Sequence, residues 1–230
     1  MSTDRMVVIE GADGSGKATQ ARLLTEHLER EGKKVAMFSF PRYEWGRSGQ
    51  LLGELLRGDH GDFMSISPYI SSLPYVIDRV AARDELVKEL DTGKVVVCDR
   101  YLPSNLAHQS AKIDSAEEKK KFTEFCEELE YENLKMPRPM AVIYLSVPVV
   151  VSTKLVEDKD ARGWLKGMTG KKDLAERDTT HQEKARAMYE QFAKERPEWY
   201  LVECVRNGEM RTREDIHKEV WGIVQERLAQ

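Results

Sequence analysis

The sequence has few cysteines and no long apolar run, and both shortages exclude classes of protein. Its 3 cysteines are Cys98, Cys126 and Cys204. An odd number at wide, irregular spacing does not suit a disulfide framework or a structural metal knot, and favours reduced thiols. No stretch reaches the roughly 20 apolar residues that a membrane span needs, and no leader pattern opens the chain. We therefore expect a cytoplasmic protein with no membrane partner.

Glycine and proline are also modest, at 15 and 8 of 230 residues, beside 40% hydrophobic and 33% charged residues. Such a composition excludes collagenous, low-complexity and disordered chains. A chain of this length buries about 70–75% of its unfolded surface, which is enough for one core, so we expect a single domain over residues 1–230. With 36 basic and 40 acidic residues the net charge is −4, so no nucleic-acid partner is expected.

Short apolar runs alternate with longer helical patterns, as in a parallel sheet with crossover helices. The runs are nearly continuous, which suits strands covered on both faces. We therefore predict an α/β fold with a five-stranded parallel sheet flanked by helices. The expected strands are 6–9, 35–40, 95–98, 141–147 and 199–204. The expected helices are 19–30, 75–90, 116–134, 180–195 and 212–228.

A glycine-rich loop follows the first expected strand and opens the first expected helix. Residues 11–17 read Gly-Ala-Asp-Gly-Ser-Gly-Lys. Glycines let backbone N–H groups curl around phosphate oxygens, the helix N-terminus favours anions, and Lys17 can reach the β and γ phosphates. This pattern predicts an ATP site, although an ordinary glycine-rich turn is the alternative. Its residues are Gly11, Asp13, Gly14, Ser15, Gly16, Lys17, Ala18 and Thr19.

Ala18 departs from the phosphate-loop pattern, because the residue after the lysine is usually a Ser or Thr that ligates Mg²⁺. Thr19 is rotated by about 100° on the helix and suits a phosphate better than the metal. Asp99 and Arg100 follow the third expected strand, at the sheet edge where α/β proteins bind ligands. We expect Asp99 to hold Mg²⁺ through water and Arg100 to grip a second phosphate. Without the loop, the two could equally form a surface ion pair.

One stretch differs in charge from its surroundings. Residues 159–177 carry six basic and three acidic side chains, a balance of +3 against −7 for the remainder. A solvated surface loop is the plain interpretation of such a run. A lid that closes over phosphates is the alternative, and it depends on the rest of the site.

Taken together, these motifs resemble the thymidylate kinase family of P-loop nucleoside monophosphate kinases. The match runs from about residue 6 to 204 in the family's order and spacing. It rests on the loop 11–17, Phe-Pro-Arg-Tyr at 40–43, Tyr75-x-x-x-Arg79, Asp-Arg-Tyr-x-x-Ser-Asn at 99–105, and Glu-Arg-Asp at 176–178.

The resemblance implies roles for single residues in the acceptor site. Asp13 would meet the 3′-hydroxyl of the sugar, Tyr75 would stack on thymine, and Arg79 would hydrogen-bond the base. The acceptor phosphate would go to Arg42 or, preferably, Arg100. Other expected acceptor residues are Phe40, Pro41, Asn105, His108 and Asp178. His108 stands where the family often has a tyrosine that crowds a ribose 2′-hydroxyl, which leaves sugar discrimination open.

The resemblance also implies that the basic stretch is a lid, at about 158–178. Its arginines Arg162 and Arg177 would stabilise the transferred phosphoryl group together with Lys17, Asp99 and Arg100. The implied reaction moves the ATP γ-phosphoryl group to dTMP, with Mg²⁺ as cofactor, in a homodimer. A kinase for another pyrimidine monophosphate and a nucleotide-binding regulator without turnover are the alternatives.

Overall fold

The structure is a computed structural model that describes residues 5–161 and 178–229, without the side chains of 156–161. Five parallel strands form its main sheet, in the spatial order β2-β3-β1-β4-β5. They are β1 (Met6–Gly11), β2 (Val35–Ser39), β3 (Val95–Asp99), β4 (Ala141–Ser146) and β5 (Trp199–Glu203). The predicted five-stranded parallel sheet is confirmed, and each strand lies within two residues of its predicted bounds.

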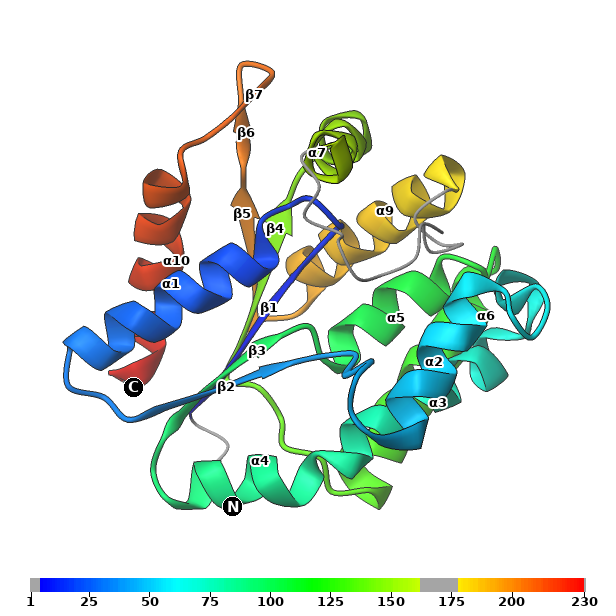
Figure 1. The fold of residues 1–230 in the computed structure, drawn as a ribbon, viewed down its shortest axis with the longest axis horizontal. Helices are drawn as coiled ribbons and strands as arrows, with labels where there is room; N and C mark the ends of the chain where they lie inside the picture. Colours follow the sequence, from blue (N-terminus) through cyan, green and yellow to red (C-terminus); the bar gives the residue numbers. More distant parts are fainter. Residues whose placement is uncertain (1–4, 162–177, 230) are drawn as a thin grey trace.

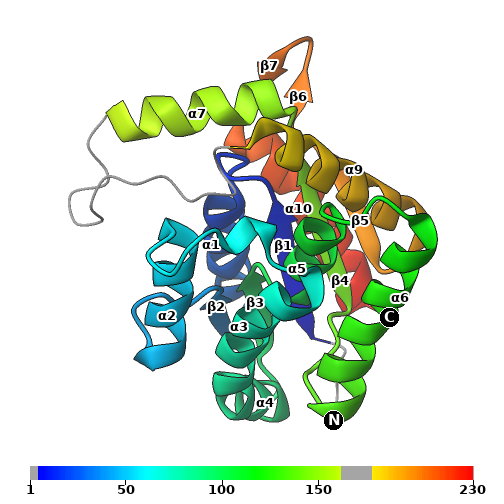
Figure 2. The same cartoon turned by 90° about the vertical axis from the view of Figure 1, so that its right-hand side faces the viewer.

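Helices cover both faces of this sheet (Figure 1). On one face lie α1 (Lys17–Arg30) and α10 (Arg213–Leu228). The other side of the sheet carries α2 (Gly46–Arg57), α3 (Pro68–Ala81), α4 (Arg83–Asp91), α5 (Leu102–Ser110), α6 (Ala116–Glu127) and α9 (Thr179–Glu195). Helix α7 (Val149–Ala161) extends past the end of the sheet, beside the hairpin β6 (Val205–Arg206) and β7 (Glu209–Met210) (Figure 2). Among the described residues, none of these helices is long and apolar enough to cross a membrane.

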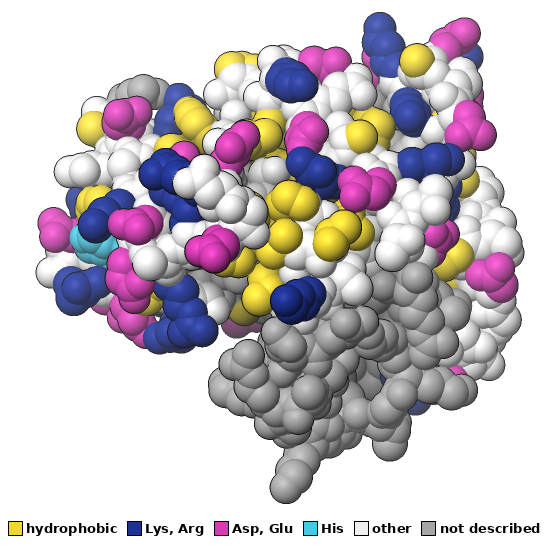
Figure 3. All heavy atoms as spheres, turned by 90° about the horizontal axis from the view of Figure 1, so that it is seen from above, with side chains coloured by type: hydrophobic (Ala, Val, Ile, Leu, Met, Phe, Trp, Pro, Cys, Tyr) yellow, Lys and Arg dark blue, Asp and Glu magenta, His cyan; other side chains and the backbone are white. Residues whose placement is uncertain are grey.

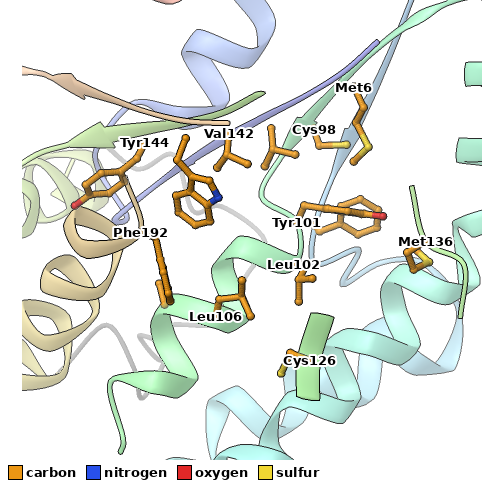
Figure 4. Packing of buried hydrophobic residues seen from close by; sticks show 14 of the residues in the cluster. Met6, Cys98, Tyr101, Leu102, Leu106, Cys126, Met136, Val142, Tyr144 and Phe192 are labelled. Atoms are coloured by element: carbon orange, nitrogen blue, oxygen red, sulfur yellow. The ribbon is translucent and has the colours of Figure 1, made fainter. Parts of the chain in front are cut away.

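Two apolar cores explain the continuous apolar runs of the strands. Along β1, Met6 and Val8 belong to the core under α5 and α9, whereas Val7 and Ile9 belong to the core under α1 and α10. Because successive side chains of a strand point to opposite faces, a strand covered on both faces needs apolar residues at every position. Figure 4 shows the first of these cores, in which Tyr101 and Leu106 of the β3–α5 segment pack with residues of the neighbouring elements.

Several helices differ from the sequence prediction. The pattern at 75–90 is two helices, α3 and α4, which meet at Ala82. The pattern at 116–134 is α6 followed by a π-helical turn, Glu128–Asn133. Helices α2, α5 and α7 were not predicted. Proline occupies the first turn of both α3 and α5, where its missing N–H costs no hydrogen bond, so it marked two helix starts that apolar periodicity alone did not show.

The parallel strands end at one edge of the sheet and bring the predicted motifs together there. Ile9, near the end of β1, is paired with Asp99, the last residue of β3, which is also paired with Ser39 of β2. The loop after β1 and the turn after β3 are therefore neighbours, although 88 residues separate Gly11 from Asp99 in the chain. This edge is where open α/β sheets bind ligands.

Candidate active site

A cavity of about 830 Å³ lies at this edge of the sheet. The loop residues Ala12 to Lys17 line it, together with the turn after β3 and side chains from α3, α5 and α9. Of the predicted site residues, it brings together Asp13, Gly14, Ser15, Gly16, Lys17, Ala18, Thr19, Phe40, Pro41, Tyr75, Arg79, Asp99, Arg100, Asn105 and His108. One cavity therefore holds both the loop and most of the predicted acceptor residues.

The backbone of the glycine-rich loop requires its glycines. Gly14 and Gly16 have φ of 81° and 91°, in the left-handed region that side chains disfavour. At Gly11 a Cβ atom would lie 2.7 Å from Ser15 Oγ and 2.9 Å from the Leu145 carbonyl oxygen. Gly11 thus allows the close approach of loop and β4, but it is not among the described residues that line the cavity.

Lys17, the first residue of α1, folds back over this loop. Its Nζ donates to the Ala12 carbonyl oxygen at 2.7 Å and lies 3.4 Å from Asp13 Oδ1. Burial lowers the pKa of the Lys17 ammonium, and the nearby Arg100 charge lowers it further, while Asp13 and Asp99 oppose them. The contacts with Ala12 and Asp13 hold the ammonium group beside the loop, where phosphate oxygens would bind.

Arg100 and Asp13 form the second charged pair of the site. Arg100 Nη2 donates to Asp13 Oδ1 at 2.6 Å, and the Asp13 side chain remains 45% exposed. Burial would raise the pKa of the Asp13 carboxyl, but the charges of Arg100 and Lys17 outweigh it and hold that pKa well below its usual range. Asp13 is therefore an acceptor-only carboxylate at neutral pH.

Glu10 holds the turn that carries Arg100. Its fully buried carboxylate accepts from the Tyr101 N–H at 3.0 Å, from Ser104 Oγ at 2.7 Å and from the Tyr189 hydroxyl at 2.8 Å. Arg100 has φ of 67°, a strained value for a residue with a side chain. The Glu10 bond to the next N–H stabilises this conformation and so fixes where the guanidinium group points. Burial raises the pKa of the Glu10 carboxyl, while Arg100 and the three bonds act against the increase.

Asp99 has the chemistry of a metal-water acceptor. The residue is 9% exposed, and its Oδ1 has no hydrogen-bond partner among the described residues. Burial raises the pKa of this carboxyl, while Lys17 and Arg100 lower it. Ser15 Oγ is another buried oxygen without a partner in the described part of the chain. These two oxygens fit the water shell of a Mg²⁺ ion, but no group of three or more His, Cys, Asp or Glu side chains in the described residues could bind a metal directly.

The wall formed by α3 and α5 carries the base-binding candidates. Asn105 Nδ2 of α5 donates to the Ser72 carbonyl oxygen of α3 at 3.2 Å, which joins the two helices. Tyr75 and Arg79 lie one helical turn apart on α3 and both line the cavity. Arg79 is 2% exposed and forms a two-bond ion pair with Glu130, a contact that the sequence did not reveal.

His108 lies further along α5 and also lines the cavity. Its ring stacks near His181 at 5.8 Å between centroids and meets Tyr189 edge to face at 5.9 Å. Burial, followed by the positive charges of Arg100 and His181, lowers the pKa of His108 to about 3. The imidazole is therefore neutral at physiological pH, and its buried Nε2 has no partner within the described chain.

Besides Gly11, four of the predicted residues are not among the described residues that line the cavity. Arg42 donates from its backbone N–H to Asp78 Oδ2 at 3.0 Å, and its guanidinium lies 4.3 Å from the centre of the Trp45 ring. Asp178 is the N-cap of α9, where it accepts from the His181 N–H at 3.0 Å. Arg162 and Arg177, with most of the predicted lid, lie outside the described residues.

Sequence reasoning missed several residues that support or line the cavity. Glu10 and Glu130 lie behind its wall, where they bind the Tyr101 N–H and Arg79. The sequence does mark these two, because each places a carboxylate in an otherwise apolar pattern, after Met6–Ile9 and after Phe122 and Cys126. Gln20, Met210, Arg211, Arg213 and Ile216 line the cavity on the side of α1, the β6–β7 hairpin and α10. No motif marked this second group, because the fold alone brings α10 beside α1.

The chain is similar to known proteins over most of its length. Residues 9–216 match the family model described as thymidylate kinase. The chain is 30% identical over 189 residues to a thymidylate kinase of Mycobacterium tuberculosis (strain CDC 1551 / Oshkosh), and the match covers 82% of this chain and 85% of that one. It is 33% identical over 225 residues to a probable thymidylate kinase of Pyrococcus abyssi, covering 96% of both chains.

A solved structure has the same fold. The thymidylate kinase of Candida albicans superimposes with a TM-score of 0.70 and 21% identity, over 97% of this chain and 93% of that one. At that identity the likeness concerns the fold.

Proposed function

The chain belongs to the thymidylate kinase family, and from this membership we propose how the residues of its cavity divide the reaction. The protein is an ATP-dependent dTMP kinase, which moves a phosphoryl group from ATP to dTMP and releases dTDP and ADP. One observation carries the proposed division. A single cavity holds Lys17 with its glycine-rich loop on one side and Tyr75, Arg79 and Asn105 on the other.

The donor nucleotide would occupy the side of the cavity formed by the loop and α1. Loop N–H groups and the N-terminus of α1 suit the β and γ phosphates. The Lys17 ammonium group would stabilise the negative charge of these phosphates during transfer. The nucleoside part of ATP would extend toward Arg213 and Ile216 at the start of α10, which line the same cavity.

The acceptor would lie between α3 and α5. Its phosphate would meet Arg100, whose planar guanidinium can form two parallel bonds to phosphate oxygens. Asp13, ionised beside Arg100, would accept from the sugar 3′-hydroxyl. Tyr75 would stack on the thymine ring with Phe40 and Pro41 as further walls, and Arg79 and Asn105 would contact the edge of the base. His108 would face the sugar.

This arrangement explains how the transfer proceeds without a nucleophilic side chain. Phosphoryl transfer needs the acceptor oxygen aligned with the γ-phosphorus and charge stabilised on the moving group. Lys17 and Arg100 both approach Asp13 Oδ1, with Nζ at 3.4 Å and Nη2 at 2.6 Å from it. Two cations therefore border the space between the donor and acceptor phosphates, where they neutralise charge as it spreads in the transition state.

Mg²⁺ is the cofactor that the ATP chemistry implies. Bound at the β and γ phosphates, it supplies additional charge neutralisation there. Ala18 has no hydroxyl to offer, so Asp99 would hold the ion through water, with its unpartnered Oδ1 as the acceptor. Arg162 and Arg177 of the predicted lid would complete the positive charge around the transferred group, because the loop itself contributes Gly14 and Ser15 at the positions where an arginine could stand.

We further propose that the active form is a homodimer. Ile70 and Ile77 of α3 are 58% and 57% exposed, and seven residues place them on one face of the helix. Leu51 of the adjoining α2 is 46% exposed. An apolar helical face of this kind suits a second copy of the chain. Sedimentation should show a dimer for the wild type and a monomer for Ile77→Glu.

Small nucleotides remain the expected partners, and a cytoplasmic location remains the expected one. All three cysteines are free and buried, which supports a reducing compartment. On the face seen in Figure 3, basic and acidic side chains are interspersed around an apolar centre, and the described residues of that face form no uniformly basic surface. This distribution does not favour a nucleic-acid backbone as partner.

An ADP-release assay tests the function directly. With ATP and Mg²⁺ present, dTMP should give the highest kcat/KM among dTMP, dUMP, UMP, CMP and GMP. Higher turnover with another pyrimidine monophosphate would change the assigned acceptor. Stabilisation by ATP without ADP release on any monophosphate would instead indicate a nucleotide-binding regulator.

A further inference from the structure

Glu130 and Arg79 form an ion pair in the interior of the protein. Arg79 Nε donates to Glu130 Oε2 at 2.7 Å, and Nη2 donates to Oε1 at 2.6 Å. The two side chains are 3% and 0% exposed. Removing both charges from water costs free energy that their attraction often fails to return, so a buried ion pair is weak evidence for a stabilising role. Its presence beside a ligand cavity calls for another explanation.

The geometry of the pair leaves one edge of the arginine unused. Glu130 binds the edge formed by Nε and Nη2, and Nη1 has no partner among the described residues. Arg79 also lines the cavity, one helical turn after Tyr75. The edge that Glu130 does not bind is therefore the edge available to a ligand. Two parallel bonds hold the guanidinium plane in one orientation, which a single bond would not do.

Glu130 reaches Arg79 from a distinct piece of backbone. It lies in the π-helical turn Glu128–Asn133 that continues α6, and its own carbonyl oxygen accepts from the Met136 N–H at 2.8 Å. Phe122, Cys126 and Glu130 lie on the inner face of this segment. Single π turns inside helices occur frequently at functional sites. The turn here brings a carboxylate to a position that would otherwise suit an apolar side chain.

We propose that Glu130 is a positioning residue for recognition of the acceptor base. It orients the Arg79 guanidinium and matches its charge, so that Arg79 presents directed N–H donors to an uncharged ring carbonyl. This inference rests on the proposed function, in which Arg79 contacts the base. Without Glu130, Arg79 would be a mobile cation that binds the ring carbonyl less well and attracts anions instead.

The same geometry defines which bases are rejected. A guanidinium group has N–H donors and no acceptor. Thymine and uracil offer a carbonyl oxygen at ring position 4, whereas cytosine offers an amino group, which would place two donors against each other. A site built to hydrogen-bond one group rejects an analogue that leaves buried polar atoms unpaired. Discrimination between dTMP and dCMP therefore depends on how firmly Arg79 is held.

Kinetics of Glu130→Gln test the proposal. The variant keeps the size of the side chain and removes its charge, so one of the two parallel bonds loses its acceptor. We expect KM for dTMP to rise about tenfold and the preference for dTMP over dCMP to fall by a similar factor, as the loss of one charged hydrogen bond implies. The kcat at saturating dTMP and KM for ATP should change by less than about threefold, because these depend on the other side of the cavity.

Glu127→Gln is the matched control. Glu127 lies in the last turn of α6 and pairs with Arg196, and neither residue is among the described ones that line the cavity. This variant should leave all four kinetic quantities unchanged. If Glu127→Gln and Glu130→Gln gave the same losses, or if Glu130→Gln lowered kcat with no change in KM or base preference, the pair would be only a structural link between α3 and α6.

Two further variants separate failure of this inference from failure of the assigned role of Arg79. Arg79→Met should raise KM for dTMP at least as much as Glu130→Gln; no change would overturn the base-binding role itself. A strong effect of Arg79→Met with none of Glu130→Gln would overturn only the positioning role. Should Glu130→Gln fail to fold, Glu130→Asp keeps the charge but not the reach, and it should still lower the preference for dTMP over dCMP. An unchanged preference would overturn the proposal.

Discussion

Arg100 and Asp13, which both line the cavity, bind each other with 2.6 Å between Nη2 and Oδ1. In the proposed complex, Arg100 holds the dTMP phosphate and Asp13 the sugar hydroxyl. Arg100 has other N–H groups for the phosphate, and no side chain of the described residues hydrogen-bonds Asp13 Oδ2. The pair can therefore persist when dTMP binds, so each residue positions the other before the substrate arrives.

Arg100→Ala should weaken dTMP much more than ATP. The change removes the phosphate contact and the partner of Asp13, and a charged hydrogen bond of this kind contributes about 1.5–3 kcal/mol. Binding titrations with each nucleotide check the expectation. Arg83→Ala is the control, because Arg83 pairs with the exposed Asp84 on α4. Equal weakening of both nucleotides by Arg100→Ala would contradict the acceptor role.

Lys17→Ala should lower kcat by at least about a hundredfold, since the loss of one preorganised charge at the transition state has effects of this size. The variant should still fold, because Lys17 makes only local contacts with Ala12 and Asp13. Steady-state kinetics measure the change in kcat, and thermal unfolding of the same preparation shows whether the variant is folded. Turnover above a tenth of the wild-type rate would show that the loop does not hold the transferred phosphate.

The sheet was predictable because its signal is local. Apolar runs such as Val95 to Cys98 are continuous only when a strand is covered on both faces, and glycine spacing alone marks the loop before Lys17. Residue-level contacts were less accessible. The direction of the Arg42 side chain depends on Asp78, 36 residues away, whose carbonyl oxygen accepts from Arg42 Nη2 at 3.2 Å.

The buried acids show what sequence patterns hide. Glu10 ends an apolar strand and Glu130 follows two apolar positions of a helix, so each resembles the polar end of an element. Their roles come from Tyr101, Ser104, Tyr189 and Arg79, which the fold brings in from distant segments. A sequence indicates that such an acid is unusual, but its partner is set by tertiary packing.

At least one of Arg162→Ala and Arg177→Ala should lower kcat by about a hundredfold or more, because an arginine that stabilises the transferred group has effects of this order. KM for dTMP should change little, since the proposed acceptor contacts lie on α3, on α5 and in the loops that carry Asp13 and Arg100. Kinetics of the two single variants, with thermal unfolding as a check on folding, separate them. If both kept more than half of the wild-type kcat, Lys171 and Lys172 would be the next candidates.

Ala18→Ser should change the Mg²⁺ requirement by less than about tenfold, or roughly 1.4 kcal/mol, because water already completes the shell of the ion in the proposed site. Chelation should abolish activity, and Asp99→Asn should lower turnover strongly. Mg²⁺ titrations of the three proteins at fixed ATP test this. An inactive wild type that Ala18→Ser activates would show that the alanine disables catalysis.

His108→Gln should make the protein less sensitive to acid. Burial, with Arg100 and His181, lowers the pKa of His108 from 6.5 to about 3 in the folded state. Between these values the unfolded chain binds a proton at His108 that the folded protein does not, so the free energy of unfolding decreases as the pH falls through this range. The contribution of the neutral His108 ring to the free energy of unfolding is therefore fully present above pH 6.5, and it is lost as the pH falls toward 3.

Urea unfolding at pH 7 and pH 5 measures the effect. The decrease in the free energy of unfolding between these pH values should be smaller in His108→Gln than in the wild type, by up to about 2 kcal/mol for one group titrating over that interval. His181 and His217 also have lowered pKa values, through burial first, and they keep a residual dependence in both proteins. His60→Gln is the control, because His60 is 50% exposed and pairs with Glu54 on α2. If His108→Gln had the same pH dependence as the wild type, the pKa of His108 would be the same in the folded and unfolded states, which would contradict the neutral, buried ring proposed for the sugar site.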